Sequence, residues 1–301
     1  MYKNINDMSY RIFVINPGST STKLAYFEDE KKLYEANVFH DASELAKFDS
    51  AYDQLDFRKQ MILEFLDENG IDLHGVDAIV GRGGSTAPIN GGVYAVNDKL
   101  LEDTRNKVTG VDHPANLGVP LAQDLAAEYG GIALMVDGTN NALGEGPFTP
   151  TRTGTLPVQT AFEYFSRPEN MKVGDACTRS GGFVSHFGTS NSDKVHEMVE
   201  SDDPKAVRVW KAMLYNICKS IGEMAVVLSG NVDAIILGGG LLRFEDLCEY
   251  INERCGWIAP VYSYPGEVEH EAMAAGALRV LRGEEVPQTY TGIPVWKGFK
   301  D

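Results

Sequence analysis

The chain contains the same nine-residue pattern twice, and this repeat limits its possible folds more than any other feature. VDAIVGRGG occupies residues 76–84 and VDAIILGGG occupies residues 232–240, and the two share Val, Asp, Ala, Ile and the final two glycines. Each copy is a short apolar run that ends in glycine, which is typical of a buried parallel strand with a tight approach at its carboxyl end. Buried strands also resemble one another by chance. The repeat therefore indicates a duplication only if the predicted elements around the two copies follow the same order.

The elements predicted around the two copies follow the same order. Around the first copy they are, in chain order, strands at 11–15, 23–27 and 32–39, helices at 52–69 and 116–129, and a strand at 132–137. Around the second copy they are a long amphipathic helix at 204–229, a further helix-like stretch and a strand at 258–264. Strands that alternate with helices predict an α/β fold of two related halves, with a largely parallel sheet behind an antiparallel start.

The second half lacks a counterpart of the opening three strands. After Asp137 the chain runs directly into GTNNALGEGPFTPTRTGTLP, which is rich in Gly, Thr and Pro and has no strand-like alternation. A loop of this length inside a compact protein is usually functional. We therefore expect a complete first domain at 1–137 and a truncated second domain at 138–301, with the helix after about residue 271 as a candidate to pack back on the first domain.

Charge and composition narrow the class of partner. The net charge is −16 and the pI is about 4.8, which argues against nucleic acids and anionic membranes as partners. Four cysteines without a CxxC pair indicate neither a zinc site nor a disulfide framework. The sequence has no run of 18 apolar residues and no signal-peptide pattern, so we expect a cytoplasmic protein. An anionic substrate remains possible where a few cations and backbone N–H groups are gathered locally.

The loop between the first two strands carries more hydrogen-bond donors than a turn needs. It reads NPGSTSTK, and the donor-rich residues are Gly18, Ser19, Thr20, Ser21, Thr22 and Lys23. It is not a P-loop, because no glycine precedes Lys23 and a strand follows where a P-loop would start a helix. Backbone N–H groups, hydroxyls and a lysine can together hold a phosphate. From the pattern alone, a phosphate cradle and an elaborate turn remain equally open.

Other candidate residues lie at strand ends and before the last helix. Arg82 in GRGG and Arg152 in TPTRTG could bind a carboxylate or a phosphate, although a surface arginine is the alternative for both. Gly238, Gly239 and Gly240 could admit a nucleotide or could simply allow close packing. In GEVEHEA, Glu269 and its acidic neighbours could hold Mg²⁺ or could only favour a helix N-terminus. His113 and His186 have no metal-ligand spacing and are interpreted as structural.

Taken together, these motifs resemble one family. INPGSTSTK, GRGG, GGVYAVND, NNAL followed by GEGPF, VDAIIL with its glycines and the PGEVEHEA segment are similar to butyrate kinase, a member of the acetate kinase group within the actin-like ATPase superfamily. The resemblance covers nearly the whole chain, from Arg11 to about Gly283. It implies duplicated domains of the actin-like, ribonuclease H-like type that close over ATP and Mg²⁺. The implied reaction is ATP + butyrate ⇌ ADP + butyryl phosphate.

The resemblance also assigns roles to residues. Asn16 and the Gly18–Lys23 hairpin would hold phosphate and metal, Arg82 and Arg152 would clamp the carboxylate and the transferring phosphoryl group, Asp137 would lie at the reaction centre, and Glu269 would help to position Mg²⁺. The glycines at 238–240 would belong to the adenosine loop, which is altered here to GGGLLR. Family members continue after the aspartate with a histidine-bearing helix and a second phosphate loop, whereas here Asp137 joins directly to GTNNAL.

Three hypotheses about function follow. The first is a butyrate kinase-type enzyme that acts on butyrate or a similar short-chain carboxylate, is weakened by the missing second phosphate loop, and forms a homodimer or a higher homo-oligomer. The second is a non-catalytic relative that binds phosphate or a carboxylate in the first-domain cleft. The third is that the junction after Asp137 is an artefact of the gene sequence. A second sheet without its opening strands should expose an edge and apolar surface, so we predict self-association through that half.

Overall fold

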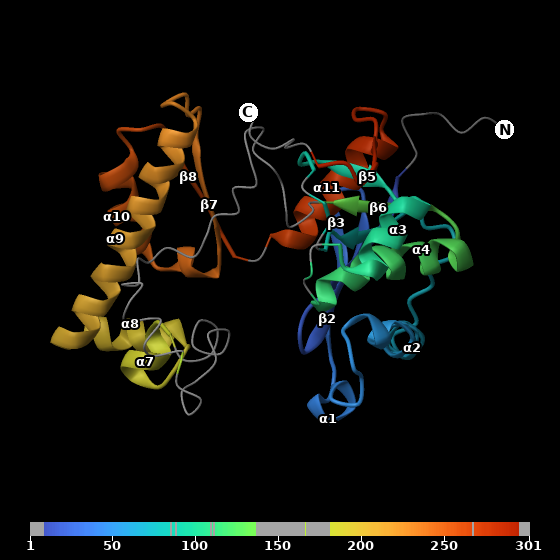
Figure 1. Ribbon diagram of the computed structural model, residues 1–301, viewed down its shortest axis with the longest axis horizontal. Coiled ribbons are helices and arrows are strands. Elements are labelled where there is room, and N and C mark those ends of the chain that lie inside the picture. Colours follow the sequence, from blue (N-terminus) through green and yellow to red (C-terminus); the bar gives the residue numbers. More distant parts are fainter. Residues whose placement is uncertain are drawn as a thin grey trace. The chain divides into compact units, whose positions relative to one another are not determined.

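The protein is described by a computed structural model that divides into two compact units (Figure 1). The structure describes residues 9–84, 86–87, 89–108, 110, 112–136, 166, 181–266 and 268–294. Unit 1 comprises Met1–Thr149 and Glu269–Asp301, and unit 2 comprises Pro150–Val268. The last helix, α11 (Glu269–Leu281), therefore belongs with the N-terminal part of the chain.

Unit 1 is built on a seven-stranded mixed sheet with the strand order β3-β2-β1-β4-β6-β5-β9. The strands are β1 (Arg11–Pro17), β2 (Ser21–Glu28), β3 (Lys31–Phe39), β4 (Ala78–Arg82), β5 (Val93–Ala95), β6 (Ile132–Val136) and β9 (Gln288–Thr289). The first three form an antiparallel meander, and β4 and β6 continue the sheet parallel to β1. This is the predicted antiparallel start followed by parallel strands.

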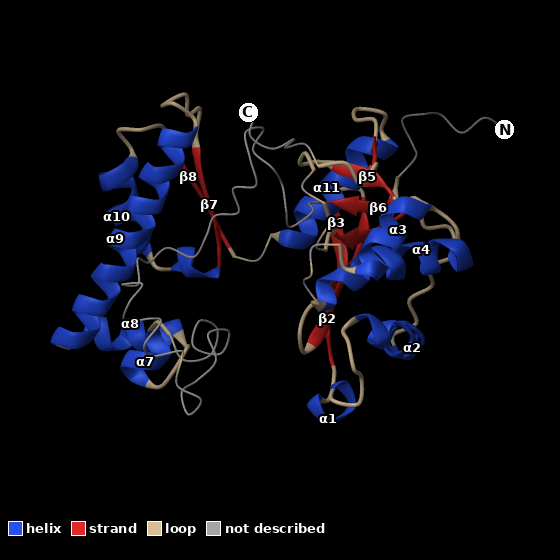
Figure 2. Cartoon of the chain, in the orientation of Figure 1, coloured by secondary structure: helices blue, strands red, loops and turns tan. Residues whose placement is uncertain are grey.

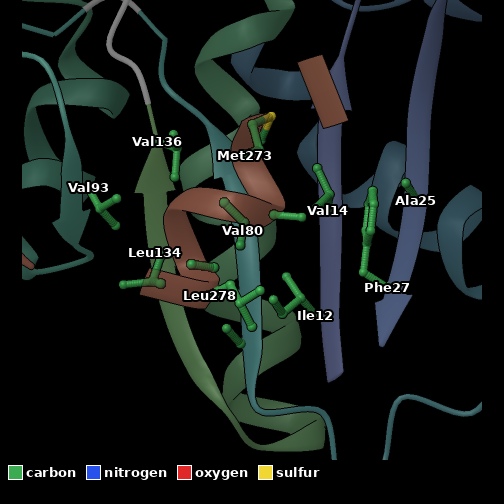
Figure 3. Packing of buried hydrophobic residues seen from close by; sticks show 13 residues of the cluster. Ile12, Val14, Ala25, Phe27, Val80, Val93, Leu134, Val136, Met273 and Leu278 are labelled. Atoms are coloured by element: carbon green, nitrogen blue, oxygen red, sulfur yellow. The ribbon is translucent and has the colours of Figure 1, made fainter. Parts of the chain in front are cut away.

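Helices cover both faces of this sheet, as the blue and red elements of Figure 2 show. The helical elements of unit 1 are α1 (Ala42–Leu45), η2 (Tyr52–Gln54), α2 (Leu55–Glu68), α3 (Asp98–Asn106), η3 (Pro114–Leu117), α4 (Gly118–Tyr129) and α11. Alternate residues of β1 explain the two layers: Phe13 and Ile15 pack towards α2 and α4, whereas Ile12 and Val14 pack towards α11. Figure 3 shows Met273 and Leu278 of α11 among the side chains of this second layer.

Unit 2 has a smaller described core. Its elements are α7 (Phe183–Phe187), α8 (Ser192–Glu200), α9 (Pro204–Val227), β7 (Ile235–Gly239), η4 (Gly240–Arg243), α10 (Glu245–Cys255) and β8 (Val261–Pro265). The parallel strands β7 and β8 pack one face against α9 and α10 around Trp210, Leu214 and Ile251. Among the described residues, this sheet has two strands.

Most elements lie where the sequence predicted them. The predicted α/β fold with a mixed sheet is confirmed, and Gly70 ends α2 with a φ of 63° as its stop position required. The sequence analysis missed the strands β5 and β9, which have only three and two residues, and the helices α1, α3, α7 and α8. Within the described part of the chain, no helix combines the length and the apolar composition that a membrane crossing requires.

Candidate functional site

Three residues predicted from separate motifs meet at one point in unit 1. The amide nitrogen of Asn16 donates to Oε2 of Glu269 at 2.6 Å. Arg82 Nη1 lies 3.3 Å from the same Glu269 oxygen and 3.4 Å from Oδ1 of Asn16. Asn16 is buried, whereas the side chains of Arg82 and Glu269 are 38 % and 50 % exposed. The cluster is thus anchored in the protein and open to solvent on its charged side.

The fold explains why these three residues converge. Asn16 lies at the carboxyl end of β1 and Arg82 at the carboxyl end of β4, and the two strands are parallel neighbours with Ile15 opposite Gly81. Carboxyl ends of parallel strands meet at one edge of a sheet, where α/β proteins bind ligands. Glu269 is the first residue of α11, where a carboxylate complements the helix dipole.

Lys23 joins this edge from the hairpin. It pairs directly with Asn16 across the antiparallel β1–β2 ladder, so the two side chains lie on the same face of the sheet. The hairpin turn closes with a hydrogen bond from Gly18 N to Ser21 O at 2.7 Å. Ser19 and Thr20 at the tip are exposed, and within the described residues their backbone N–H groups make no hydrogen bond. These two N–H groups are available to an anion.

The hydroxyl of Thr22 points into the protein. Thr22 therefore cannot offer it to a phosphate, as the predicted cradle of residues 18–23 would require. The residue is fully buried, and its hydroxyl accepts from Arg58 Nη1 at 3.2 Å and lies 2.8 Å from His40 Nε2. Because a hydroxyl has one hydrogen and two lone pairs, Thr22 can accept from Arg58 and still share a hydrogen bond with His40 Nε2, whose direction follows the tautomer of the imidazole. Burial, together with the positive charge of Arg58, lowers the pKa of His40 to about 4, so this imidazole is neutral at pH 7.

A second histidine lies at the hairpin tip. Ser19 Oγ and His113 Nε2 are 3.5 Å apart, and His113 Nδ1 accepts from Ala115 N at the start of η3. Burial, and then the nearby charges of Arg82 and Arg58, lower the pKa of His113. The sequence interpretation of His113 as purely structural therefore missed its place beside the hairpin, because the contact joins residues 94 positions apart in the chain.

Arg58 and His40 also escaped the sequence analysis. The signal for Arg58 was present in the spacing of α2: Arg58, Ile62 and Leu66 recur every four residues and are the three buried residues of that helix. An arginine in a buried stripe of this kind indicates a special role. His40 carries no such signal, because it follows β3 as a single polar residue.

The glycines of GRGG serve packing. A Cβ on Gly81 would lie 2.0 Å from the carbonyl oxygen of Gly118, and a Cβ on Gly84 would lie 2.5 Å from Asn116. These glycines therefore let the start of α4 approach the end of β4, which holds Arg82 at the sheet edge. The close contact keeps the cluster on a rigid element.

The remaining predicted residues are distributed differently. Asp137 and Arg152 lie outside the described residues. Gly238 and Gly239 end β7 in unit 2, and Gly240 begins η4. Gly239 has a φ of 113°, which requires glycine, whereas a Cβ on Gly238 would meet no atom within 4 Å. Among the described residues, no group of three or more His, Cys, Asp or Glu side chains is arranged to hold a metal ion.

Comparison with known proteins identifies the fold. No protein-family model matches the sequence. Acetate kinase from Porphyromonas gingivalis superposes with a TM-score of 0.64 at 12 % identity, over 91 % of this chain and 100 % of that one. A propionate kinase from Francisella tularensis subsp. tularensis SCHU S4 gives 0.61 at 13 % identity, over 89 % and 98 %. Acetate kinase from Entamoeba histolytica gives 0.62 at 10 % identity, over 88 % and 98 %.

These similarities extend over nearly the full length of the solved chains. The chain therefore has duplicated α/β domains, as the internal repeat predicted, in the actin-like ATPase fold that the family resemblance implied. At 10–13 % identity the similarity concerns the fold.

Proposed function

We propose that this chain is a short-chain carboxylate kinase of the butyrate kinase type, which transfers the γ-phosphoryl group of ATP to butyrate or a close analogue. The observation that carries the proposal is the Asn16–Arg82–Glu269 cluster beside the free N–H groups of the hairpin. A fold shared with acetate and propionate kinases supports it.

The chemistry requires charge compensation more than proton transfer. A carboxylate titrates near pH 4 and is ionised at pH 7, so no general base is needed for it to attack phosphorus. One carboxylate oxygen forms a bond to the γ-phosphorus as the bond from that phosphorus to the ADP oxygen breaks. The obstacle is repulsion between two anions, which Arg82 and Lys23 reduce while the hairpin N–H groups orient the phosphate.

The residues present fit a magnesium ion. Mg²⁺ prefers oxygen ligands and is usually held by one or two protein oxygens together with water and substrate phosphates. Oδ1 of Asn16 and the half-exposed carboxylate of Glu269 provide such oxygens at one point of the sheet edge. When bound, the ion would neutralise charge on the transferring phosphates. Arg82 already pairs with Glu269, so it holds that carboxylate towards the site.

Three further assignments complete the proposal and rest on the family resemblance. Asp137 would lie at the reaction centre and Arg152 would clamp the substrate with Arg82. Gly238, Gly239 and Gly240 would contact the nucleotide. Because the second phosphate loop is missing from the sequence, and each lost donor costs about 10²–10³ in rate, we expect slow turnover.

A hydroxylamine trap tests the proposal. The protein is incubated with ATP, Mg²⁺ and butyrate, and acyl phosphate is captured as the hydroxamate. We expect product in the wild type and a loss of about a hundredfold or more in Arg82→Ala, because Arg82 contacts the transferring group. Arg105→Ala is the matched control, since Arg105 is an exposed arginine at the end of α3.

Each outcome decides between the hypotheses. Product that depends on Arg82 and not on Arg105 supports the kinase. Product that is equal in both variants would show that the cluster is not the site. An absence of product, with phosphate or ATP still raising the melting temperature, would leave a binding protein without phosphotransfer activity.

A further inference from the structure

Arg58 is a fully buried cation that has no carboxylate partner among the described residues. Its side chain is 0 % exposed, a state that arginine rarely reaches unless it is paired. Its four hydrogen bonds all go to neutral oxygens: Gln54 Oε1 at 3.0 Å, Thr22 Oγ1 at 3.2 Å, Ser21 O at 3.2 Å and Ser19 O at 3.4 Å. Within the described residues it forms no ion pair.

The burial of Arg58 without a carboxylate nearby in the described part of the chain lowers the stability of the folded state. A buried charge without a counter-charge is strongly unfavourable, and an apolar side chain of similar size often stabilises such a position. Burial lowers the pKa of Arg58 to about 10, so the group still carries its charge at pH 7. The neighbouring His40 is neutral and its Nδ1 has no partner among the described atoms, so it offers no compensation.

Three of the four acceptors of Arg58 belong to the hairpin. By binding Ser19 O and Ser21 O, the guanidinium draws these carbonyls towards the interior. In a trans peptide the C=O and the following N–H point in opposite directions, so the N–H of Thr20 is turned away from Arg58 and towards solvent. Arg58 thus places positive charge beneath the loop and aims a donor outward from it.

We infer that Arg58 is the buried counter-charge of the anion bound at the hairpin: it positions the loop from below and favours a phosphate on the outer side without touching it. The inference rests on the proposed function, because it assumes that the hairpin holds phosphate. It adds a positioning residue for which the anion, when bound, is the missing partner. The positive charge of Arg58 also acts on His113 at the hairpin tip. The pKa of His113 is lowered by burial and then by the charges of Arg82 and Arg58.

The test separates charge from hydrogen bonding. Inorganic phosphate is titrated into the full chain by calorimetry, and the melting temperature is recorded without and with phosphate. Arg58→Gln keeps donors for the hairpin carbonyls and removes the charge, and Arg58→Lys keeps the charge. Lys59→Gln is the control, because the adjacent Lys59 makes a surface ion pair with Glu128 at 3.2 Å and its loss changes the net charge equally.

We expect Arg58→Gln to bind phosphate at least about tenfold more weakly, because a unit charge acting through a poorly solvated interior is worth that much or more. Arg58→Lys should stay within about threefold of the wild type and Lys59→Gln within about twofold. Without phosphate, Arg58→Gln should melt at or above the wild-type temperature, since an unpaired buried charge is gone.

The opposite pattern overturns the inference. A lower melting temperature for Arg58→Gln with unchanged phosphate affinity would make Arg58 a structural residue only, and the proposed function would stand. If Arg58→Gln does not fold, Arg58→Lys decides: binding like the wild type supports the inference, and loss of binding overturns it. If the wild type binds neither phosphate nor ATP, the proposed function fails together with the inference.

Discussion

The repeated strand is buried on both faces in unit 1 and on one face in unit 2, although the two copies share most of their sequence. In β4, Ile79 and Val80 are both 0 % exposed, because β1 and β6 flank the strand and helices cover both faces. In β7, Ile236 corresponds to Val80 and is 70 % exposed. Tyr262, which pairs with Ile236 on β8, is 52 % exposed. A strand motif fixes the local conformation, and its burial depends on neighbours supplied elsewhere in the chain.

The helices that precede the two copies, α2 and α9, also differ in how far their apolar faces are covered. In unit 1, Ile62 and Leu66 of α2 pack against Leu24 and Val38 of the opening meander. In unit 2, the corresponding stripe of α9 faces a cavity of about 810 Å³, lined by residues that include Met213, Ile217, Ile221, Met224 and Leu228. Among the described residues that line this cavity, none is Asp, Glu, Lys or Arg.

The glycines at the strand ends provide the largest expected contrast. Gly81→Ala would place a methyl group 2.0 Å from the Gly118 carbonyl, a contact that only backbone movement can relieve, so we expect a loss of about 3 kcal/mol or more. Gly238→Ala is the matched variant, because its new Cβ would meet nothing within 4 Å, and it should stay within about 0.5 kcal/mol. Urea denaturation followed by circular dichroism measures both. Equal effects would contradict the difference between the units.

Much of this architecture was accessible from the sequence, because it depends on local pattern. The meander, α2, α4 and α9 follow from apolar periodicity and from glycine stops. The meeting of Asn16 with Arg82 follows from the rule that parallel strands end at one edge. The three-residue β5 and the two-residue β9 were missed, because so few residues carry no readable period.

The buried support of the hairpin was not accessible in this way. Arg58 and His40 act through contacts to Thr22 that span 36 and 18 positions, and no local pattern encodes such pairs. The burial of Arg58 was foreseeable from the four-residue spacing with Ile62, but its partners were not. The exposure of Ile236 and Tyr262 agrees with the predicted apolar surface in the second half, a prediction that came from comparing the order of elements in the two halves.

Acidification should affect unit 1 through His40. The pKa of His40 is lowered from 6.5 to about 4, so between these values the unfolded chain binds more protons than the folded one and stability falls as pH falls. Full protonation corresponds to a loss of about 3 kcal/mol at most. His40→Gln should lack this component, whereas His74→Gln, which changes an exposed histidine of the same unit, should keep it.

Urea titrations at pH 7, 5.5 and 4 measure this effect as the difference between each variant and the wild type. The difference for His40→Gln should shift in favour of the variant as the pH is lowered. A difference that does not change with pH would mean that His40 titrates normally in the folded protein, and the buried support beneath the hairpin would then be more open to water than the structure indicates.

The smallest expected effect concerns self-association of the chain through the exposed face of β7 and β8. Ile236, Tyr262 and Tyr264 form one exposed apolar group, because Ile236 pairs with Tyr262 and Gly238 pairs with Tyr264 across β7 and β8. Apolar groups of this kind mark interaction sites, so we expect concentration-dependent association of the chain. A charge in the group should weaken it: Ile236→Lys should raise the dissociation constant about tenfold, or about 1.4 kcal/mol.

Sedimentation velocity over a range of concentrations measures this constant. Leu33→Lys is the control, because Leu33 is 46 % exposed on β3, one of the two edge strands of the unit 1 sheet. If both variants weaken association equally, the exposed group of unit 2 is not the specific contact. Net charge would not explain such a result, because one added lysine changes it from −16 to −15 and so reduces repulsion between copies. If the wild type stays monomeric at every concentration, exposure in unit 2 has no consequence for assembly. The two copies of the motif would then differ in burial, and the exposed copy would have no role in assembly.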